Sequence, residues 1–423
     1  MMSSSRLSCL LLALCSLWGG PGCSSESLAS DDAAGGSGAT GGGGGASSAD
    51  DLPDYATSGC YGEPRNTSIY NGDTHELSEL AAICRGESER VRVYVADALF
   101  DGGISQDEVN GFIHRLELIG QASSYRPDLG VLPTNEDVFG ALDPALLAGD
   151  KLPIFVFDTQ GAGDGYLCSW CSGAELHLDG SILDPLNGDL ALSIAAHEAF
   201  HAIHRGFDGN EDMWVDESLA EAAMSVNGFF TDRAALNDFA ARPNVNWGPA
   251  REDIRDYHYG AGLAFGTWLW EFGGEELMRR ATAAPENGWA GIDAALSGAG
   301  HSQTGLDAFL EMAAALYLDD VERGYGFRSF DLVTQVRAEA LDDGATASGT
   351  LQPFGLVYYR VSAGVRALQV SALSSVHARL LAHAQAVELL PIEVNAAIEV
   401  EEGQVLILTS AGAAPVPYSV SAQ

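Results

Sequence analysis

Basic side chains are scarce in this 423-residue chain, which carries 21 lysine and arginine residues against 59 aspartate and glutamate residues. Its single lysine is Lys151. The formal charge of −38 repels a phosphate backbone, so the composition argues against a nucleic-acid partner. Hydrophobic residues nevertheless make up 46% of the chain, which is too many for a disordered acidic tail. We therefore expect a folded protein of two or three domains.

Long hydrophobic runs are also absent. The apolar stretch Leu7 to Trp18 follows Arg6 and is too short to cross a bilayer. Residues 1–22 are therefore predicted to be a signal peptide, and Cys23 ends a segment that resembles a bacterial lipobox, whose cysteine becomes the lipid anchor. Ordinary signal-peptidase cleavage that leaves Cys23 free is the alternative. We expect an exported protein, either lipid-anchored in the bacterial envelope at the outer membrane or secreted, with Cys23 as its only membrane contact.

Cysteine is sparse behind the signal peptide. Residues 23–58 are rich in glycine, serine and alanine and are predicted to be a flexible tether. The four cysteines beyond it favour two disulfides in an exported chain, and proximity along the sequence favours Cys60–Cys84 and Cys168–Cys171. A zinc site of four thiolates is the rival interpretation, but the chain lacks a second Cys-x-x-Cys motif.

Two patterns of secondary structure divide the remaining chain. Residues 59–349 are predicted to be an α+β domain, in which a mixed sheet precedes a mostly helical part, and residues 350–423 a small all-β, sandwich-like accessory domain. Whether residues 59–150 hold a propeptide or belong to the main domain stays open. The strongest strand signals are at 91–95, 154–157, 175–178, 356–359, 367–370, 405–408 and 418–420. The strongest helix signals are the capping box Ser105/Glu108 and the run 190–205, which contains no glycine or proline.

The run 190–205 contains the motif His197-Glu198-Ala199-Phe200-His201. Residues four apart lie on one face of a helix, so both imidazoles can bind one metal ion, while the carboxylate of Glu198 reaches a water molecule on that ion. With the histidine and glutamate content of this chain, His-Glu-x-x-His is expected about 0.015 times by chance. The motif therefore predicts a catalytic zinc ion bound by His197 and His201, with Glu198 as general base.

Zinc needs a third protein ligand. His204 lies one turn beyond His201, but three successive ligands on one straight helix cannot converge tetrahedrally, so a structural role is expected for it. The metzincin pattern requires Gly at 204 and His at 207, and this chain has His204 and Phe207. A carboxylate from the following segment, Met213 to Glu221, is the remaining option.

The motif followed by Trp214-Val215-Asp216-Glu217 resembles the gluzincin metallopeptidases, in particular secreted bacterial metallopeptidase-like proteins and lipoproteins of that clan. The resemblance covers roughly residues 150–275 and implies a zincin-like catalytic domain. It implies that Glu217 is the third zinc ligand and that Glu221 orients a zinc histidine. Asp216 departs from the asparagine that is common in the clan, and Ser218 from glycine. The spacer to this second motif is too short for the clan's aminopeptidases.

A peptidase of this kind also needs a donor to the oxyanion of the tetrahedral intermediate. Gluzincins supply a tyrosine or a histidine from a later helix, and this chain offers Tyr259, then His258, then Tyr257, in that order of preference. Packing of these rings at the start of the helix is an equally good interpretation. By analogy with other zincins, the strand at 175–178 is expected to be the edge to which an extended peptide adds.

The sequence thus predicts an exported zinc metallopeptidase, a hydrolase acting on peptides or proteins. A non-catalytic, metal-stabilised surface or adhesion lipoprotein and a zinc hydrolase of non-peptide amides are the alternatives. Acidic residues between 208 and 221 could favour cationic substrates or bind Ca²⁺, although a solvated acidic loop is the plainer interpretation.

Overall fold

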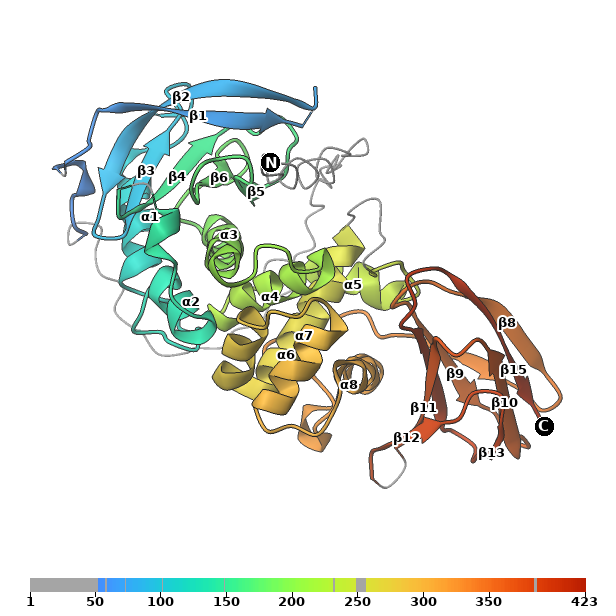
Figure 1. The fold of residues 1–423 in the computed structure, drawn as a ribbon. Coiled ribbons are helices and arrows are strands. Elements are labelled where there is room, and N and C mark those ends of the chain that lie inside the picture. Colours follow the sequence, from blue (N-terminus) through green and yellow to red (C-terminus); the bar gives the residue numbers. More distant parts are fainter. Residues whose placement is uncertain are drawn as a thin grey trace, which may run out of the picture.

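The computed structural model describes residues 52–57, 59–72, 74–100, 102–147, 149–230, 233–248, 256–383 and 386–423. The predicted signal peptide, Cys23 and the tether as far as residue 51 lie outside these ranges. Within them, helices that combine the length and the hydropathy needed to cross a membrane are absent. The fold is mixed α and β, with a sheet and helices in the N-terminal part and a β-rich C-terminal region (Figure 1).

A six-stranded mixed sheet forms the upper left of Figure 1, in the order β1-β2-β3-β4-β6-β5. Strands β3, β4 and β6 run parallel, and the other pairs are antiparallel. The strands are β1 (Pro64–Asn71), β2 (Glu76–Glu87), β3 (Val91–Val95), β4 (Leu152–Phe157), β5 (Gly165–Leu167) and β6 (Leu176–Asp179). The predicted strands at 91–95, 154–157 and 175–178 are thereby confirmed as β3, β4 and, within one residue, β6.

Strands β1 and β2 carry no clear hydrophobic alternation, because much of their length is exposed. They pair with each other, and β2 also pairs with β3, so the segment that the sequence left open belongs to the same sheet as β4. The capping box is confirmed at the start of α1 (Gln106–Glu117): the Glu108 N–H donates to the Ser105 hydroxyl, and the Ser105 N–H donates to the Glu108 carboxylate at 2.7 Å.

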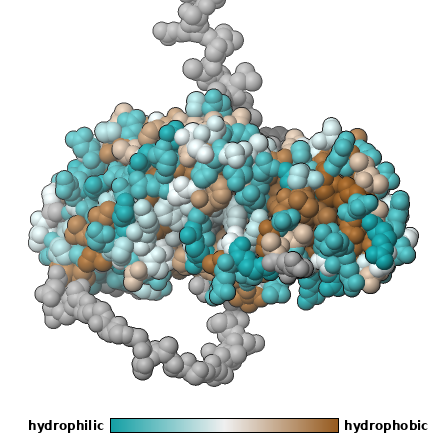
Figure 2. Space-filling view, turned by 90° about the horizontal axis from the view of Figure 1, so that it is seen from below, coloured by the Kyte–Doolittle hydropathy of each residue, from teal (hydrophilic) through white to brown (hydrophobic). Residues whose placement is uncertain are grey.

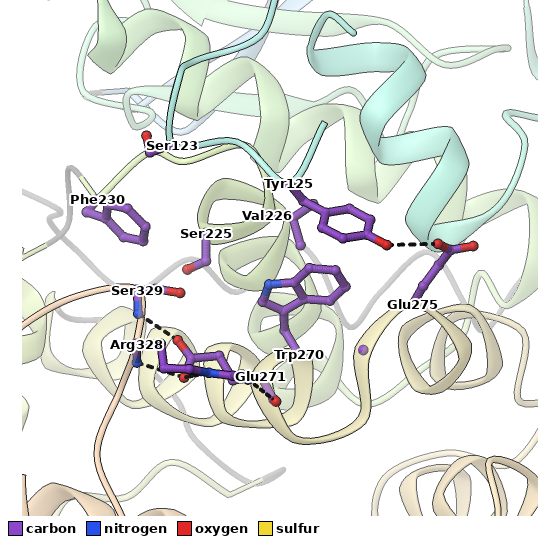
Figure 3. Close-up of a pocket in the computed structure, with 11 residues that line it drawn as sticks. Ser123, Tyr125, Ser225, Val226, Phe230, Trp270, Glu271, Glu275, Arg328 and Ser329 are labelled. Atoms are coloured by element: carbon purple, nitrogen blue, oxygen red, sulfur yellow. Dashed lines mark hydrogen bonds and ion pairs between the residues drawn. The ribbon is translucent and has the colours of Figure 1, made fainter. Parts of the chain in front are cut away.

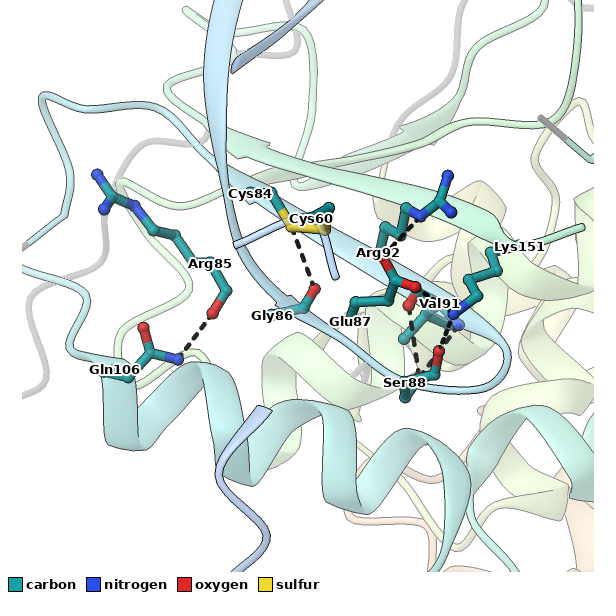
Figure 4. Close-up of a disulfide and its surroundings, with 10 residues drawn as sticks. All are labelled: Cys60, Cys84, Arg85, Gly86, Glu87, Ser88, Val91, Arg92, Gln106 and Lys151. Carbon is teal, nitrogen blue, oxygen red and sulfur yellow. Dashed lines mark hydrogen bonds and ion pairs between the residues drawn. A yellow bond between two sulfur atoms is a disulfide. The ribbon is translucent and has the colours of Figure 1, made fainter. Parts of the chain in front are cut away.

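Both predicted disulfides are present, as Cys60–Cys84 and Cys168–Cys171, which is consistent with an exported protein. The first joins the segment before β1 to strand β2 (Figure 4). In the same figure, Lys151 and Arg92 both contact the carboxylate of Glu87. Burial works against ionisation of Glu87, but these two cations hold its pKa below the usual value. Lys151, the single lysine of the chain, therefore forms an ion pair within the fold.

Removing the Cys60–Cys84 disulfide in the double variant Cys60→Ser/Cys84→Ser is expected to lower the free energy of unfolding by about 3 kcal/mol, because the bridge closes a loop of sequence separation 24 in the unfolded chain. Chemical denaturation of the purified protein measures this. Removing Cys168–Cys171, with a separation of only 3, should cost less. An unchanged unfolding midpoint in the first variant would contradict the expectation.

The helices below the sheet form the middle of the molecule (Figure 1). Besides α1 they are α2 (Val131–Phe139), α3 (Asp189–Phe207), α4 (Met213–Val226), α5 (Arg233–Ala241), α6 (Asp256–Thr282), α7 (Trp289–Gly298) and α8 (Gly305–Leu318). Helix α3 confirms the predicted run 190–205. Its alanines, such as Ala195 and Ala199, join the core beneath the sheet, whereas Phe200 and Ile203 join the core of the helical part. The remaining face of α3 carries the motif histidines.

Glycines let α6 approach its neighbours closely. A Cβ atom at Gly266 would lie 1.9 Å from the carbonyl oxygen of Ser218 in α4, and one at Gly260 would lie 2.0 Å from that of Ala235 in α5. Such distances exclude any side chain at either position. This close packing brings the first turn of α6, with Tyr259, next to α4 and the motif helix.

The C-terminal region is composed of two sheets, in the orders β13-β10-β15-β8 and β12-β11-β14-β9-β7. Its strands are β7 (Glu339–Leu341), β8 (Thr346–Leu351), β9 (Leu356–Val361), β10 (Ala367–Ala372), β11 (Val376–Ala382), β12 (Glu388–Ile392), β13 (Ala397–Glu399), β14 (Val405–Ser410) and β15 (Val416–Ala422). The four strands expected here are confirmed as β9, β10, β14 and β15. The sheets share one core, in which the hydroxyls of Tyr359 and Tyr418 hydrogen-bond at 2.8 Å.

This β-rich region is attached to the helical part through α8. Tyr358 of β9 donates to the carbonyl of Ala313 at 3.0 Å, and Arg379 of β11 pairs with Asp307. Viewed from below, hydrophobic residues gather at the right of the molecule, the side of the β-rich region (Figure 2). Edge strand β12 exposes Leu390 to 44%. Pro391 has no N–H to offer a further strand, which protects this edge.

Candidate metal centre

Helix α3 brings His197, Glu198 and His201 to one cavity. The two imidazole rings lie edge to face, with centroids 4.8 Å apart, as expected for residues four apart on one helix face. His197 is 7% exposed and Glu198 is 6% exposed. The motif is thus a buried group of polar side chains, which requires partners to be stable in this environment.

Helix α4 supplies the third side chain, Glu217. Its Oε2 lies 3.3 Å from Nε2 of His197 and 4.0 Å from Nε2 of His201. Ligands of a tetrahedral zinc ion are about 3.3 Å apart, given bonds of about 2.0 Å. Glu217 Oε2 is buried and has no hydrogen-bond partner among the described residues. Two imidazole nitrogens and a carboxylate oxygen converging on one point fit zinc.

Two carboxylates of α4 hold the imidazoles from behind. Glu221 Oε1 lies 3.4 Å from Nδ1 of His197. Asp216 Oδ2 lies 3.0 Å from Nδ1 of His201. Because each Nδ1 faces a carboxylate, each Nε2 is directed toward Glu217, the arrangement that orients histidine ligands of metals. Glu221 therefore lies beside the ring nitrogen of His197 that faces away from Glu217.

Sequence reasoning assigned no role to Asp216, which was noted only as a departure from asparagine. Its Oδ1 lies 2.6 Å from Nδ1 of His204, so one carboxylate joins His201 to the next histidine of α3. Asparagine has one acceptor oxygen and could accept from only one of these rings. The sequence did contain a signal for this contact, namely an aspartate in place of asparagine together with two histidines, His201 and His204, on the preceding helix.

The charges of the histidines of α3 and of the carboxylates around them compensate one another. Burial works against the ionisation of Asp216, but His201 and His204 hold its pKa below the usual range. Burial likewise disfavours protonated His201, yet Asp216 raises its pKa to about 9. Burial raises the pKa of Glu198, while the two motif histidines act in the opposite direction. The carboxylates thus favour positive charge at the imidazoles, where a metal cation would replace the protons.

A cavity of about 570 Å³ opens beside these side chains. One wall is strand β5, at the edge of the sheet. The expectation that the strand at 175–178 forms this edge is wrong: β6 lies between β4 and β5. The three-residue strand β5 lies in a glycine-rich segment without a hydrophobic alternation, so its pattern did not indicate a strand.

The backbone of β5 faces the cavity. Backbone hydrogen bonds to β6 lie at both ends of β5, and in an antiparallel pair the bonded and non-bonded positions alternate. Gly165 and Leu167 occupy the non-bonded positions, so their N–H and C=O groups point away from β6. Both residues line the cavity, and the N–H of Leu167 hydrogen-bonds the carboxylate of Glu198. The edge strand therefore also positions the motif glutamate.

Of the three suggested oxyanion donors, Tyr259 lies in the site. It lines the cavity, and its ring centroid is 6.3 Å from that of His197. His258 is 3% exposed and is not among the residues lining the cavity. The side chain of Tyr257 lies outside what the structure describes.

Two other places in the described structure bring together polar side chains or enclose a cavity. Cys168, Cys171 and His177 lie close enough together to hold an ion, but the cysteines are joined in a disulfide and offer no thiolate. A second cavity of about 470 Å³ is lined by Tyr125 and Trp270, among other residues (Figure 3). Its Glu271 already accepts the backbone N–H groups of Arg328 and Ser329, at 2.8 and 2.7 Å. Its lining contains neither histidine nor cysteine.

The variant Asp216→Asn is expected to weaken zinc binding about 10- to 100-fold, because one of two histidines loses its acceptor and His201 is held less firmly. Competition with a chromogenic chelator measures the dissociation constant. Asp128→Asn, at an exposed position, is the matched control and should bind zinc as the unaltered protein does. Equal zinc affinity in both variants would contradict a role of Asp216 in positioning His201.

Comparisons with known proteins add no identification. No protein-family model and no curated protein matches the chain. A de novo designed double-stranded β-helix is 12% identical, covering 19% of this chain and 99% of its own, with a TM-score of 0.15. The periplasmic lysozyme inhibitor PliG of Salmonella Typhimurium is 9% identical; the match covers 21% of this chain and 100% of the inhibitor, with a TM-score of 0.17. The pre-peptidase C-terminal domain of a Bacillus anthracis collagenase is 16% identical; the match covers 21% of this chain and 97% of that domain, with a TM-score of 0.16.

Proposed function

We propose that this protein is an exported zinc metallopeptidase of the gluzincin type. The observation that carries the proposal is the convergence of His197, His201 and Glu217 on one point, with Glu198 beside them in the same cavity. Two histidines and one carboxylate leave a fourth zinc position open, which is typical of catalytic rather than structural sites. The zincin-like fold and the lipid anchor at Cys23 are part of this proposal.

The chain's own residues have separable tasks in the reaction. A bound zinc ion would acidify a water molecule and polarise the scissile carbonyl. Glu198 takes the proton of that water and passes it to the leaving amine, and the Leu167 N–H keeps its carboxylate in place. Tyr259, on the cavity wall near His197, donates a hydrogen bond to the oxyanion.

The edge strand suggests how a peptide is held. The outward N–H and C=O groups of Gly165 and the outward C=O group of Leu167 can pair with an extended substrate, which adds a strand to the sheet. Strand addition fixes the direction of the substrate backbone and places a carbonyl in front of Glu198. A substrate without a peptide backbone could not use these groups, so peptides are favoured over other amides.

A metal-stabilised adhesion protein is the second candidate. Such a site needs no buried glutamate next to its histidines and no open cavity of about 570 Å³. Structural zinc sites are closed by four protein ligands, and the described residues supply three here. The geometry therefore favours the peptidase.

A proteome-derived peptide library tests the proposal. The zinc-loaded mature protein should generate new peptide termini, detected by mass spectrometry, and a chelator should abolish them until zinc is restored. The absence of any chelator-sensitive cleavage under these conditions would contradict the proposed activity.

A further inference from the structure

Two acidic side chains in the cavity have no task in the proposed reaction. Asp208 directly follows helix α3 as its C-cap residue, and Glu211 lies in the loop that leads to α4. Both line the cavity together with the proposed metal ligands. Asp208 follows His201 by seven residues, which corresponds to about 10 Å along the helix axis.

Asp208 is held in an environment that suits a cation. It is only 8% exposed, and its Oδ1 accepts the backbone N–H of Asn210 at 3.1 Å. Its Oδ2 is buried and has no hydrogen-bond partner among the residues described. A buried carboxylate oxygen without a partner is costly, and a positively charged ligand would remove that cost.

Glu211 adds a second negative charge. Its Oε1 accepts the backbone N–H groups of Asp212 at 2.5 Å and of Gly288 at 2.7 Å, so the side chain is fixed. Burial and the charge of Asp208 both raise its pKa, which a nearby cation would lower.

Arg205 is the one arginine or lysine in the described lining of this cavity. It forms no ion pair with Asp208 or Glu211, and its guanidinium donates to the backbone carbonyl of Cys168 at 3.1 Å. Nor do Asp208 and Glu211 belong to either group of residues in the described chain that is close enough together to hold a metal ion.

We infer that Asp208 and Glu211 form a subsite for a lysine or arginine side chain of the substrate. This inference rests on the proposed peptidase function and adds the class of substrate. An extended peptide covers about 10 Å in about three residues. The basic side chain therefore lies within three residues of the scissile bond and contacts Asp208, with Glu211 beside it.

Matched peptides test the inference. One series carries arginine near the cleavage site and the other carries citrulline, which has a similar shape without the charge. We expect the zinc-loaded protein to cleave the arginine peptides with kcat/KM at least about tenfold higher, and this ratio to fall as salt is added. Asp208→Asn should reduce the ratio toward one, Glu211→Gln should reduce it partly, and the exposed control Asp128→Asn should preserve it.

A binding measurement separates the subsite from catalysis. Calorimetry with the zinc-loaded Glu198→Gln protein should show tighter binding of the arginine peptide than of the citrulline peptide. Chelator-sensitive cleavage without preference for arginine would overturn this inference alone, whereas no cleavage of any peptide together with equal binding would overturn both proposals. Calcium binding that is lost in Asp208→Asn, with no arginine preference, would assign the pair to a metal instead.

Discussion

Glu198→Gln is expected to lower kcat about 10²- to 10⁴-fold while the protein retains about one zinc ion per chain. Glutamine keeps the shape of the side chain and can still accept the N–H of Leu167, but it cannot take a proton from water. Initial rates on a cleaved library peptide and elemental analysis of the same sample measure the two quantities.

The control for this variant is Glu276→Gln, an exposed glutamate on α6 that pairs with Arg280. It should retain both zinc and full activity. Unchanged turnover in Glu198→Gln would exclude Glu198 as general base. Loss of zinc in that variant would instead show that Glu198 helps to bind the metal.

His201→Ala is expected to reduce the zinc content from about one to below about 0.1 ions per chain after gel filtration. The variant leaves only His197 and Glu217, and two ligands do not hold zinc tightly. It also removes the contact that His201 makes with Asp216. Inductively coupled plasma mass spectrometry on gel-filtered protein measures the zinc content.

His75→Ala is the matched control, because His75 is exposed and lies in the turn between β1 and β2, outside the cavity lining. This variant should retain its zinc. Circular dichroism of both variants shows whether the fold persists. A folded His201→Ala protein that still binds one zinc ion would contradict the proposed ligand set.

The sequence predicted the parts of the molecule that depend on local patterns. The motif helix, the capping box at Ser105, and strands β3 and β4 follow from residue spacing that one segment carries by itself. The two disulfides followed from proximity along the chain. The convergence of Glu217 with the motif histidines was implied by resemblance, and the structure brings these residues together.

The parts that were missed depend on contacts between distant segments. Strand β5 is three residues long, and only its pairing with β6 makes it an edge strand. Asp216 gains its role because the packing of α4 against α3 places it between His201 and His204. Asp208 resembled any solvated acidic residue in the sequence, and its burial could be seen only once α3 had its place in the fold.

The position of a bound metal tests the central claim most directly. Crystals of the zinc-loaded protein, measured at the zinc absorption edge, should show one anomalous peak about 2.0 Å from Nε2 of His197, Nε2 of His201 and a carboxylate oxygen of Glu217. The fourth position should hold a water molecule next to Glu198. An anomalous peak at another site, or a zinc-saturated crystal without a peak between these three side chains, would contradict the account.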